Sequence, residues 1–346
     1  MPDSPLVPII DGHNDVLLRM MQPGQDDPVA GFLEGEGRGH IDLPRAKAGG
    51  LAGGLFAIFV PSPHHRPDAD GNFVAPEQAS ALNQTLAMAR KFFELEARSQ
   101  GQIKVCRNSI ELQACIEQSI FAPVLHIEGA EGIGEDLDAL HVLHQAGLRS
   151  LGPVWSRPNI FAHGVPFRVP HSPDIGPGLT DAGRALVRIC NHLKILIDLS
   201  HMNEQGFWDT ARLSDAPLVA THSNAHALSP HSRNLTDRQL DAIGESKGLV
   251  GINYGVLFLR DDGVRNLDTP LQIVVDHIRY IADRIGIERV ALGSDFDGTT
   301  VPNELKDAAG LPRLIELMRQ NGFDQISIER VAYRNWLDVL ARTWGN

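Results

Sequence analysis

Eight short apolar runs, each bounded by turn residues, recur along the chain. They are continuously apolar rather than alternating, as is typical of strands in a parallel sheet covered on both faces. The runs occupy residues 7–12, 54–61, 122–129, 148–155, 194–201, 217–223, 248–255 and 290–296. Stretches with helical character separate several of them, at 76–99, 136–147, 180–193, 236–247 and 269–286. This alternation predicts an α/β protein whose strands form a (β/α)8 barrel of the TIM type.

An open, doubly wound parallel sheet is the alternative arrangement for such a pattern. Its usual nucleotide-binding version is excluded, because neither GxGxxG nor GxxxxGK[ST] follows any predicted strand. Residues 303–346 predict two extra C-terminal helices, which we expect to pack outside the barrel. Since α/β barrels often form one domain at this length, we predict a single domain over residues 1–346.

The composition is that of an ordinary globular protein. Hydrophobic residues make up 42% of the chain and charged residues 21%, with a formal net charge of −12. Because no Lys- or Arg-rich block is present, nucleic acid is not an expected partner. Cys106, Cys115 and Cys190 occur without a CxxC motif, which favours reduced thiols. The N-terminal sequence resembles no signal peptide, and no apolar run reaches the ~18 residues of a membrane span, so we predict a cytoplasmic protein without membrane contact.

Acidic and imidazole side chains stand at the carboxyl ends of four predicted strands. His13 and Asp15 follow the first apolar run, Glu128 ends the third, and His201 and His222 end the fifth and sixth. Because alternate residues of a strand share a face, His13 and Asp15 are expected to point the same way. The carboxyl ends of barrel strands form one rim, where the chemistry takes place. Three imidazoles and two carboxylates at this rim predict a site for two divalent metal ions, with zinc a suitable choice.

Each motif also has a simpler explanation when it is taken alone. A His and an Asp beside a glycine turn can merely satisfy backbone groups. The joint placement at strand ends favours metal binding, and Glu128 is the obvious carboxylate to bridge two ions. Asp295, in LGSDFDG on the last strand, is a candidate for orienting the attacking water or a substrate amine, and Asp297 competes with it for this role.

Six segments together resemble the membrane (renal) dipeptidase family, metallopeptidases of the amidohydrolase-like barrel group. The segments occur in family order and, with a C-terminal RNWLDVL, span nearly the whole chain: IIDGHND, LHIEGAEGI, ILIDLSHMN, THSNAHALSPHSRNLTD, GLVGINY and LGSDFDG. The combination is highly specific, although each piece alone is not. The resemblance implies two Zn²⁺ ions per chain, one held by His13, Asp15 and Glu128 and the other by Glu128, His201 and His222.

On the same resemblance, the activity is zinc-dependent hydrolysis of the amide bond of a small dipeptide-like substrate with a free carboxylate. Arg233 would bind that carboxylate, for which a guanidinium fork is suited. Asp295 would lie near the substrate amine and the water nucleophile and transfer a proton. Glu128 would contribute to catalysis between the two ions. The resemblance also points toward a homodimer.

The chain departs from the animal members of this family at one substrate-contacting position. Those members carry a His after the fourth strand, where LGPVWSRPN here places Trp155. An indole donates one hydrogen bond but cannot carry a proton or a charge. Trp155 is assigned to substrate binding. His163 in the following Pro- and Gly-rich loop is either a replacement for the missing imidazole or simply a solvated loop residue. The animal members are also secreted and lipid-anchored with disulfides, so only the catalytic domain is expected to carry over.

Two other functions stay open at this point. A related amidohydrolase could use the same site on a lactone, a phosphoester or a non-peptide amide. Many binuclear barrels of that kind bridge their metals with a carboxylated Lys, whereas the strand ends here offer Glu128 and no Lys. A catalytically impaired homologue that only binds metal or ligand is the second alternative, and Trp155 is the residue that suggests it.

Overall fold

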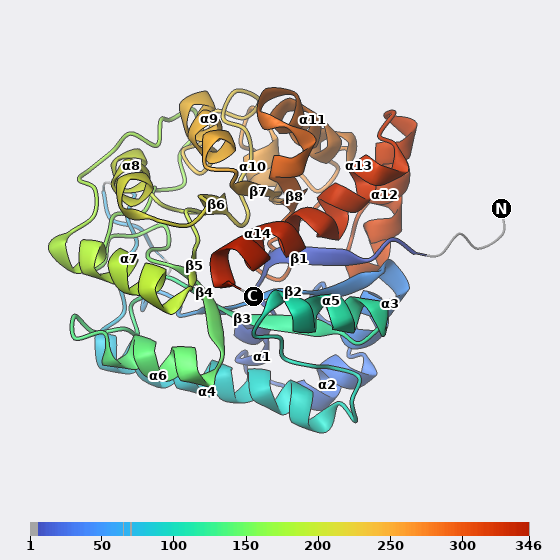
Figure 1. Ribbon diagram of the computed structural model, residues 1–346, viewed down its shortest axis with the longest axis horizontal. Helices are drawn as coiled ribbons and strands as arrows, with labels where there is room; N and C mark the ends of the chain where they lie inside the picture. Colours follow the sequence, from blue (N-terminus) through green and yellow to red (C-terminus); the bar gives the residue numbers. More distant parts are fainter. Residues whose placement is uncertain (1–5, 65, 70, 346) are drawn as a thin grey trace.

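The computed structural model describes residues 6–64, 66–69 and 71–345. Over these residues, eight strands alternate with helices, and each strand lies within or overlaps one of the eight predicted apolar runs (Figure 1). The strands are β1 (Ile9–Asn14), β2 (Leu51–Phe59), β3 (Ala122–Glu128), β4 (Leu148–Gly152), β5 (Leu196–Ile197), β6 (Val219–Ala220), β7 (Leu249–Ile252) and β8 (Val290–Leu292). The strand positions predicted from the apolar runs are therefore confirmed.

At least one α-helix follows every strand, and Figure 1 shows the helices surrounding the central strands. The helices are α1 (Val16–Met20), α2 (Pro28–Glu34), α3 (Leu43–Gly49), α4 (Gln78–Arg98), α5 (Ser109–Glu117), α6 (Asp138–Ala146), α7 (Asp181–Leu193), α8 (Glu204–Leu213), α9 (Asp237–Glu245), α10 (Val256–Leu259), α11 (Gln272–Ile285), α12 (Leu311–Gln320), α13 (Gln325–Glu329) and α14 (Asn335–Trp344). Short 3₁₀ turns η1 (Ile287–Arg289) and η2 (Ala308–Gly310) and a π-helical turn η3 (Arg330–Arg334) complete them. None of the helices in the described part of the chain is both long and apolar enough to cross a membrane.

All strand pairings are parallel. Strands β1 to β5 form one sheet in chain order, and β6 to β8 form a second. Single parallel bridges link the two sheets, from Asp198 after β5 to Val219 of β6 and from Asn14 of β1 to Phe296 after β8. Parallel strands in chain order, each followed by a helix, confirm the predicted TIM-barrel-like α/β class. This arrangement brings the carboxyl ends of the strands to one side of the molecule.

The strands bury apolar surface on two sides. Toward the surrounding helices, Phe56 of β2 lies 6.3 Å from Phe32 of α2 and 6.2 Å from Phe92 of α4 between ring centroids. At the amino ends of the strands, the fully buried Trp336 of α14 packs against interior residues of the strands and donates its Nε1–H to the carbonyl of Leu292 at 3.0 Å. The expectation of extra C-terminal helices outside the strands did not specify where α14 packs. This helix covers the amino-terminal end of the strands because its apolar residues complete that end of the core.

Candidate metal centre

The five predicted ligands meet where the strands end. His13 is the penultimate residue of β1, Asp15 precedes α1, and Glu128 is the last residue of β3. His201 and His222 lie in the turns that follow β5 and β6. All five residues are buried, none being more than 6% exposed. The structure therefore brings together side chains from four strands that are far apart in sequence.

One carboxylate oxygen lies among three imidazoles. Oε1 of Glu128 is 2.9 Å from Nε2 of His201 and 3.3 Å from Nε2 of His222. The same oxygen is 3.6 Å from Nε2 of His13. The Nε2 atoms of His201 and His222 are themselves 3.1 Å apart. Four atoms with ligand character thus point at one small region around Glu128.

A second group of ligand atoms lies on the other side of His13. Nε2 of His13 is 3.4 Å from Oδ2 of Asp15. The ligand atoms of His13, Asp15 and Asp295 lie within 4.8 Å of one another, as do those of His13, Glu128 and His222. The two groups share His13, and the geometry offers two neighbouring positions for cations.

The backbone turns sharply at two of the site residues. His201 has a φ of +68° and Asp295 a φ of +58°, in the left-handed region that few residues other than glycine adopt. The N–H of Asp295 donates to the carbonyl of His13 at 3.0 Å, and Nδ2 of Asn253 donates to Oδ2 of Asp295 at 2.8 Å. Backbone strain of this kind persists only where surrounding contacts fix it, and it occurs often at functional sites.

Burial and crowding shift the acid–base properties of the cluster. Burial raises the pKa of Glu128 well above its ordinary value, and Asp15 and Asp295 add to this rise. Burial, helped by the charge of Asp15, also raises the pKa of Asp295 to about 6. Burial alone would lower the pKa of His13, but Glu128, Asp15 and Asp295 together raise it to about 10. Without a cation, the cluster therefore retains protons near neutral pH.

The residues fit a pair of divalent metal ions. Both ring nitrogens of His13 and Oδ1 of Asp15 are buried without a hydrogen-bond partner in the described structure. Such orphaned polar atoms are costly unless something satisfies them. Burial lowers the pKa of His201 and His222 well below the ordinary value, which keeps both imidazoles neutral and able to coordinate. A set of imidazole and carboxylate ligands suits zinc and related ions.

Arg233 reaches the same centre from the turn after β6. Its Nη1 donates to Oγ of Ser223 at 3.0 Å, and its Nη2 donates to the carbonyl of His222 at 3.0 Å. The residue is 4% exposed, its Nε has no partner, and its Cζ lies 5.8 Å from the ring centroid of Phe258. No ion-pair partner lies within 4.0 Å among the described residues. The site thus contains the positively charged guanidinium of Arg233, whose Nε–H is free to donate a further hydrogen bond.

Trp155 lies beside the metal ligands. Its ring centroid is 5.7 Å from that of His201. Its other aromatic neighbours are Phe59, Phe73 and Phe167, at 5.0, 5.2 and 5.5 Å. Phe167 is itself 38% exposed. Trp155 therefore belongs to an aromatic wall next to the candidate centre.

Two candidates from the sequence serve other purposes. Oδ2 of Asp297 accepts from Nε of Arg19 at 3.0 Å, and its Oδ1 accepts from the backbone N–H of His40 at 2.5 Å. Asp297 is thus engaged in a buried ion pair, and Asp295 is the acid that faces the ligands. His163 lines a different surface pocket with Arg168.

Three buried polar residues around the centre were not predicted from the sequence. Oγ of Ser156 is 2.7 Å from Nδ1 of His201. Asn253 holds Asp295, and Asp198 lies after β5 beneath His222. All three follow apolar strand runs, as the predicted ligands do. A search for every polar residue at a strand end, instead of only for ligand types, would have found them.

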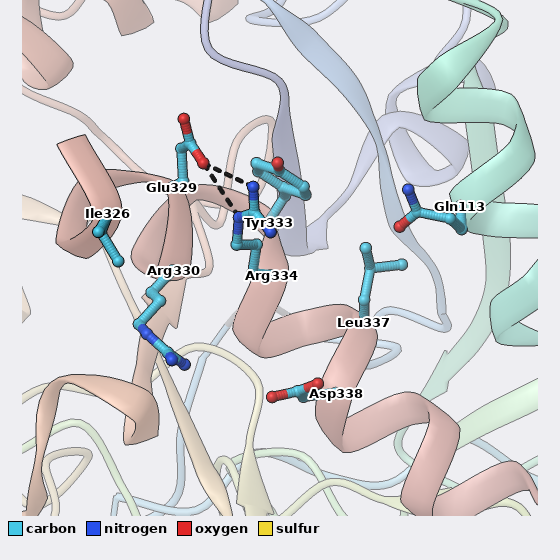
Figure 2. A pocket seen from close by; sticks show the side chains of 8 residues that line it. All are labelled: Gln113, Ile326, Glu329, Arg330, Tyr333, Arg334, Leu337 and Asp338. Atoms are coloured by element: carbon cyan, nitrogen blue, oxygen red, sulfur yellow. Dashed lines mark hydrogen bonds and ion pairs between the residues drawn. The ribbon is translucent and has the colours of Figure 1, made fainter.

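A surface pocket on the C-terminal helices contains none of these residues (Figure 2). In this pocket, Nη2 and Nε of Arg334 donate to Oε2 of Glu329 at 2.8 and 3.0 Å. The residues that line it are Gln113, Ile326, Glu329, Arg330, Tyr333, Arg334, Leu337 and Asp338. This pocket therefore does not include any of the grouped His, Asp and Glu side chains.

A TIM-barrel-like α/β fold with buried His, Asp and Glu side chains grouped at the carboxyl ends of its strands is typical of a metal-dependent hydrolase. The chain matches the family model described as membrane dipeptidase (peptidase family M19) over residues 5–344, and it belongs to that family. It is accordingly a metallodipeptidase, as the segments shared with the family predicted.

Similar proteins agree with this assignment. The solved structure of a dipeptidase described as a family M19 metallopeptidase is 51% identical, with a TM-score of 0.94 over 99% of this chain and 100% of that chain. A metallopeptidase from Rhodobacter sphaeroides, solved with a phosphinate mimic of the dipeptide L-Ala-D-Ala, is 50% identical, with a TM-score of 0.94 over 98% of this chain and 100% of that chain. Dipeptidase tcpJ of Claviceps purpurea (strain 20.1) is 27% identical over 95% of this chain and 76% of its own length.

Proposed function

We propose that this metallodipeptidase holds two zinc ions and cleaves small dipeptides that carry a free C-terminal carboxylate. His13, Asp15 and Glu128 would hold one ion, and Glu128, His201 and His222 the other. The observation that carries the proposal is the position of Glu128, whose Oε1 lies within 3.6 Å of an Nε2 atom of all three imidazoles. When bound, the two ions would polarise the scissile carbonyl and acidify a water molecule.

Asp295 is suited to proton transfer in this site. Its carboxylate lies with His13 and Asp15, and Asn253 fixes its Oδ2 by a hydrogen bond of 2.8 Å. A pKa raised to about 6 lets a carboxylate take up a proton and give it back near neutral pH. Asp295 would therefore accept a proton from the nucleophile and pass it to the leaving amine.

Arg233 is the residue that would select a substrate with a free C-terminal carboxylate. Its charge is held by neutral partners, Ser223 and the carbonyl of His222, so a substrate carboxylate would be the first anion to pair with it directly. We expect Arg233→Ala to raise KM on the order of 100-fold while lowering kcat much less. Steady-state kinetics with a dipeptide measures both values.

A dipeptide amide provides the sharper comparison for Arg233. The unaltered protein should strongly prefer a dipeptide to the same dipeptide with an amidated C-terminus, and Arg233→Ala should lose that preference. Arg238→Ala, at an exposed position of α9, is the matched control and should behave like the unaltered protein. An unchanged KM in Arg233→Ala, with the preference retained, would remove Arg233 from substrate binding.

The aromatic side chains beside the metal ligands favour a small substrate. The ring centroids of Trp155 and Phe167 lie 5.7 and 6.3 Å from that of His201, and Phe73 packs against both rings. The relative from Rhodobacter sphaeroides binds a mimic of L-Ala-D-Ala, which supports including L-Ala-D-Ala among the substrates. A panel of L,L- and L,D-dipeptides, N-acyl amino acids and lactones tests this. Hydrolysis of lactones or N-acyl amino acids, with no turnover of any dipeptide, would favour the non-peptide alternative.

Zinc binding should release protons and weaken as the pH falls. His13 and Glu128 have pKa values raised above their ordinary range, so at pH 7.5 the metal-free cluster carries protons that a metal ligand must lose. Calorimetric titration of the metal-free protein in two buffers with different ionisation enthalpies should give different apparent heats. Equal heats in both buffers, or tighter zinc binding at pH 6 than at pH 8, would contradict the protonation states inferred for this cluster.

A further inference from the structure

A layer of buried polar side chains lies beneath the metal centre. His126, Ser150, Asp198 and Thr221 are each no more than 1% exposed. Below them, toward the amino ends of the strands, the interior is apolar, with Val124, Leu196 and Val219 packed against α14. None of these four polar residues belongs to the proposed ligand set. Buried polar groups cost folding free energy unless they are hydrogen-bonded, so the partners of each of these groups can be traced.

Asp198 is the acceptor on which this layer is built. Its Oδ1 accepts the backbone N–H groups of Ser200 at 3.0 Å and Thr221 at 2.8 Å, and its Oδ2 accepts the hydroxyl of Thr221 at 2.6 Å. No Lys or Arg of the described residues lies within ion-pair distance of it; its charged or chargeable neighbours at that range are His126 and His222. The carboxylate of Asp198 is therefore held by hydrogen-bond donors and not by an ion pair with Lys or Arg.

These hydrogen bonds fix the tautomer of His222. A carboxylate can only accept, so the proton of the Thr221 hydroxyl points at Asp198. Oγ1 of Thr221 is also 2.8 Å from Nδ1 of His222, and toward this nitrogen the hydroxyl can only accept. Nδ1 of His222 must then carry the proton. The lone pair is left on Nε2, the atom that lies 3.3 Å from Oε1 of Glu128.

The same carboxylate lies close to a ligand of the other metal ion. Nδ1 of His126 is 2.9 Å from Oγ of Ser150, but Nε2 of His126 has no partner and is 3.7 Å from Oδ2 of Asp198. His13 also has an unpartnered Nδ1, and ligand-type atoms of His13, His126 and Asp198 lie within 4.8 Å of one another. A separation of 3.7 Å is too long for a direct hydrogen bond and suits a bridging water.

We propose that Asp198 is a positioning residue for both metal ions, acting on His222 through Thr221 and on His13 through one buried water. The water would accept from Nδ1–H of His13 and donate to Nε2 of His126 and Oδ2 of Asp198, so that every polar atom in the layer is paired. This proposal rests on the two-zinc site proposed above. Outer partners of this kind typically change metal affinity by roughly 10- to 100-fold.

The connection from Asp198 to His222 through Thr221 and the connection to His13 through a water are tested separately. Zinc content and affinity are measured by chelator competition for the unaltered protein, Thr221→Val and Thr221→Ser, together with the melting temperature of each metal-free protein. We expect Thr221→Val to bind one of its two zinc ions about 10- to 100-fold more weakly, and Thr221→Ser, which keeps the hydroxyl, to recover most of this loss. Thr343→Val removes a buried hydroxyl of α14 that donates to the carbonyl of Val339, outside the layer, and serves as the matched control.

The water-mediated connection to His13 is tested by the same measurement of zinc affinity. His126→Phe should weaken the binding of the zinc ion that His13 holds. A zinc-bound crystal structure should show a water within hydrogen-bond distance of His13, His126 and Asp198. Zinc affinity in Thr221→Val and His126→Phe equal to that of the unaltered protein would overturn the positioning role alone. Fewer than two zinc ions in the unaltered protein would instead overturn the two-zinc site on which it rests.

Discussion

Glu128→Gln is expected to abolish dipeptide hydrolysis, lowering kcat/KM on the order of 10⁴-fold or more because the group lies at the centre of the reaction. Glu128 is the carboxylate that all three imidazoles approach, with Oε1 at 2.9, 3.3 and 3.6 Å from their Nε2 atoms. An amide has nearly the same shape but lacks the charge that two cations would share. We therefore expect zinc content to fall together with activity, and both are measured on the same preparation.

The matched control for Glu128 lies on the loop after the same strand. Glu135 is exposed, so Glu135→Gln removes one negative charge close in sequence without touching the centre. Its activity and zinc content should equal those of the unaltered protein. Full zinc content and near-normal turnover in Glu128→Gln would show that the carboxylate neither bridges metal ions nor takes part in catalysis.

Asp295→Asn should lower kcat by about 10²- to 10⁴-fold, the range expected for loss of an acid–base group. KM should change little, because Arg233 and not Asp295 binds the substrate carboxylate. The structural reason is that Asp295 faces His13 and Asp15 while Asn253 holds its second oxygen. The kcat of the unaltered protein should fall below about pH 6 as Asp295 takes up its proton, and this limb of the pH profile should be absent in the variant.

Asp297→Asn is the comparison that shows whether the two neighbouring acids differ. Asp297 pairs with Arg19, which also pairs with Glu36, so loss of the Asp297 charge weakens a buried ion-pair network and lowers folding stability without leaving Arg19 unpaired. We expect a lower melting temperature but a kcat within a few-fold of normal. A large loss of kcat in Asp297→Asn with no loss in Asp295→Asn would reverse the assignment of the two acids.

The strands that carry the site could be predicted from the sequence, because continuously apolar runs mark buried strands and the change to polar residues marks where each strand ends. The run before Glu128 in β3 and the run before His201 are continuously apolar, and the change to polar residues occurs where each strand reaches the rim. The shared segments then assigned the family. Both inferences depend on local sequence, which a single chain displays directly.

Features that depend on distant contacts could not be predicted in this way. Trp336 looks like a residue of an ordinary amphipathic helix, and only the assembled fold shows that it closes the amino-terminal end of the strands. Arg157, in a loop rich in Pro and Gly, is fully buried against Glu131 at 2.8 Å and reaches the carbonyl of Val60. The layer around Asp198 likewise exists only once β3, β4, β5 and β6 are side by side.

The central claim is that two zinc ions share Glu128. Crystals of the zinc-loaded protein, measured on both sides of the zinc absorption edge, test it most directly. The account predicts two anomalous peaks per chain, each about 2.0–2.2 Å from an oxygen of Glu128 and a similar distance from His nitrogens. A single peak, or two peaks with Glu128 beyond bonding distance of either, would contradict it.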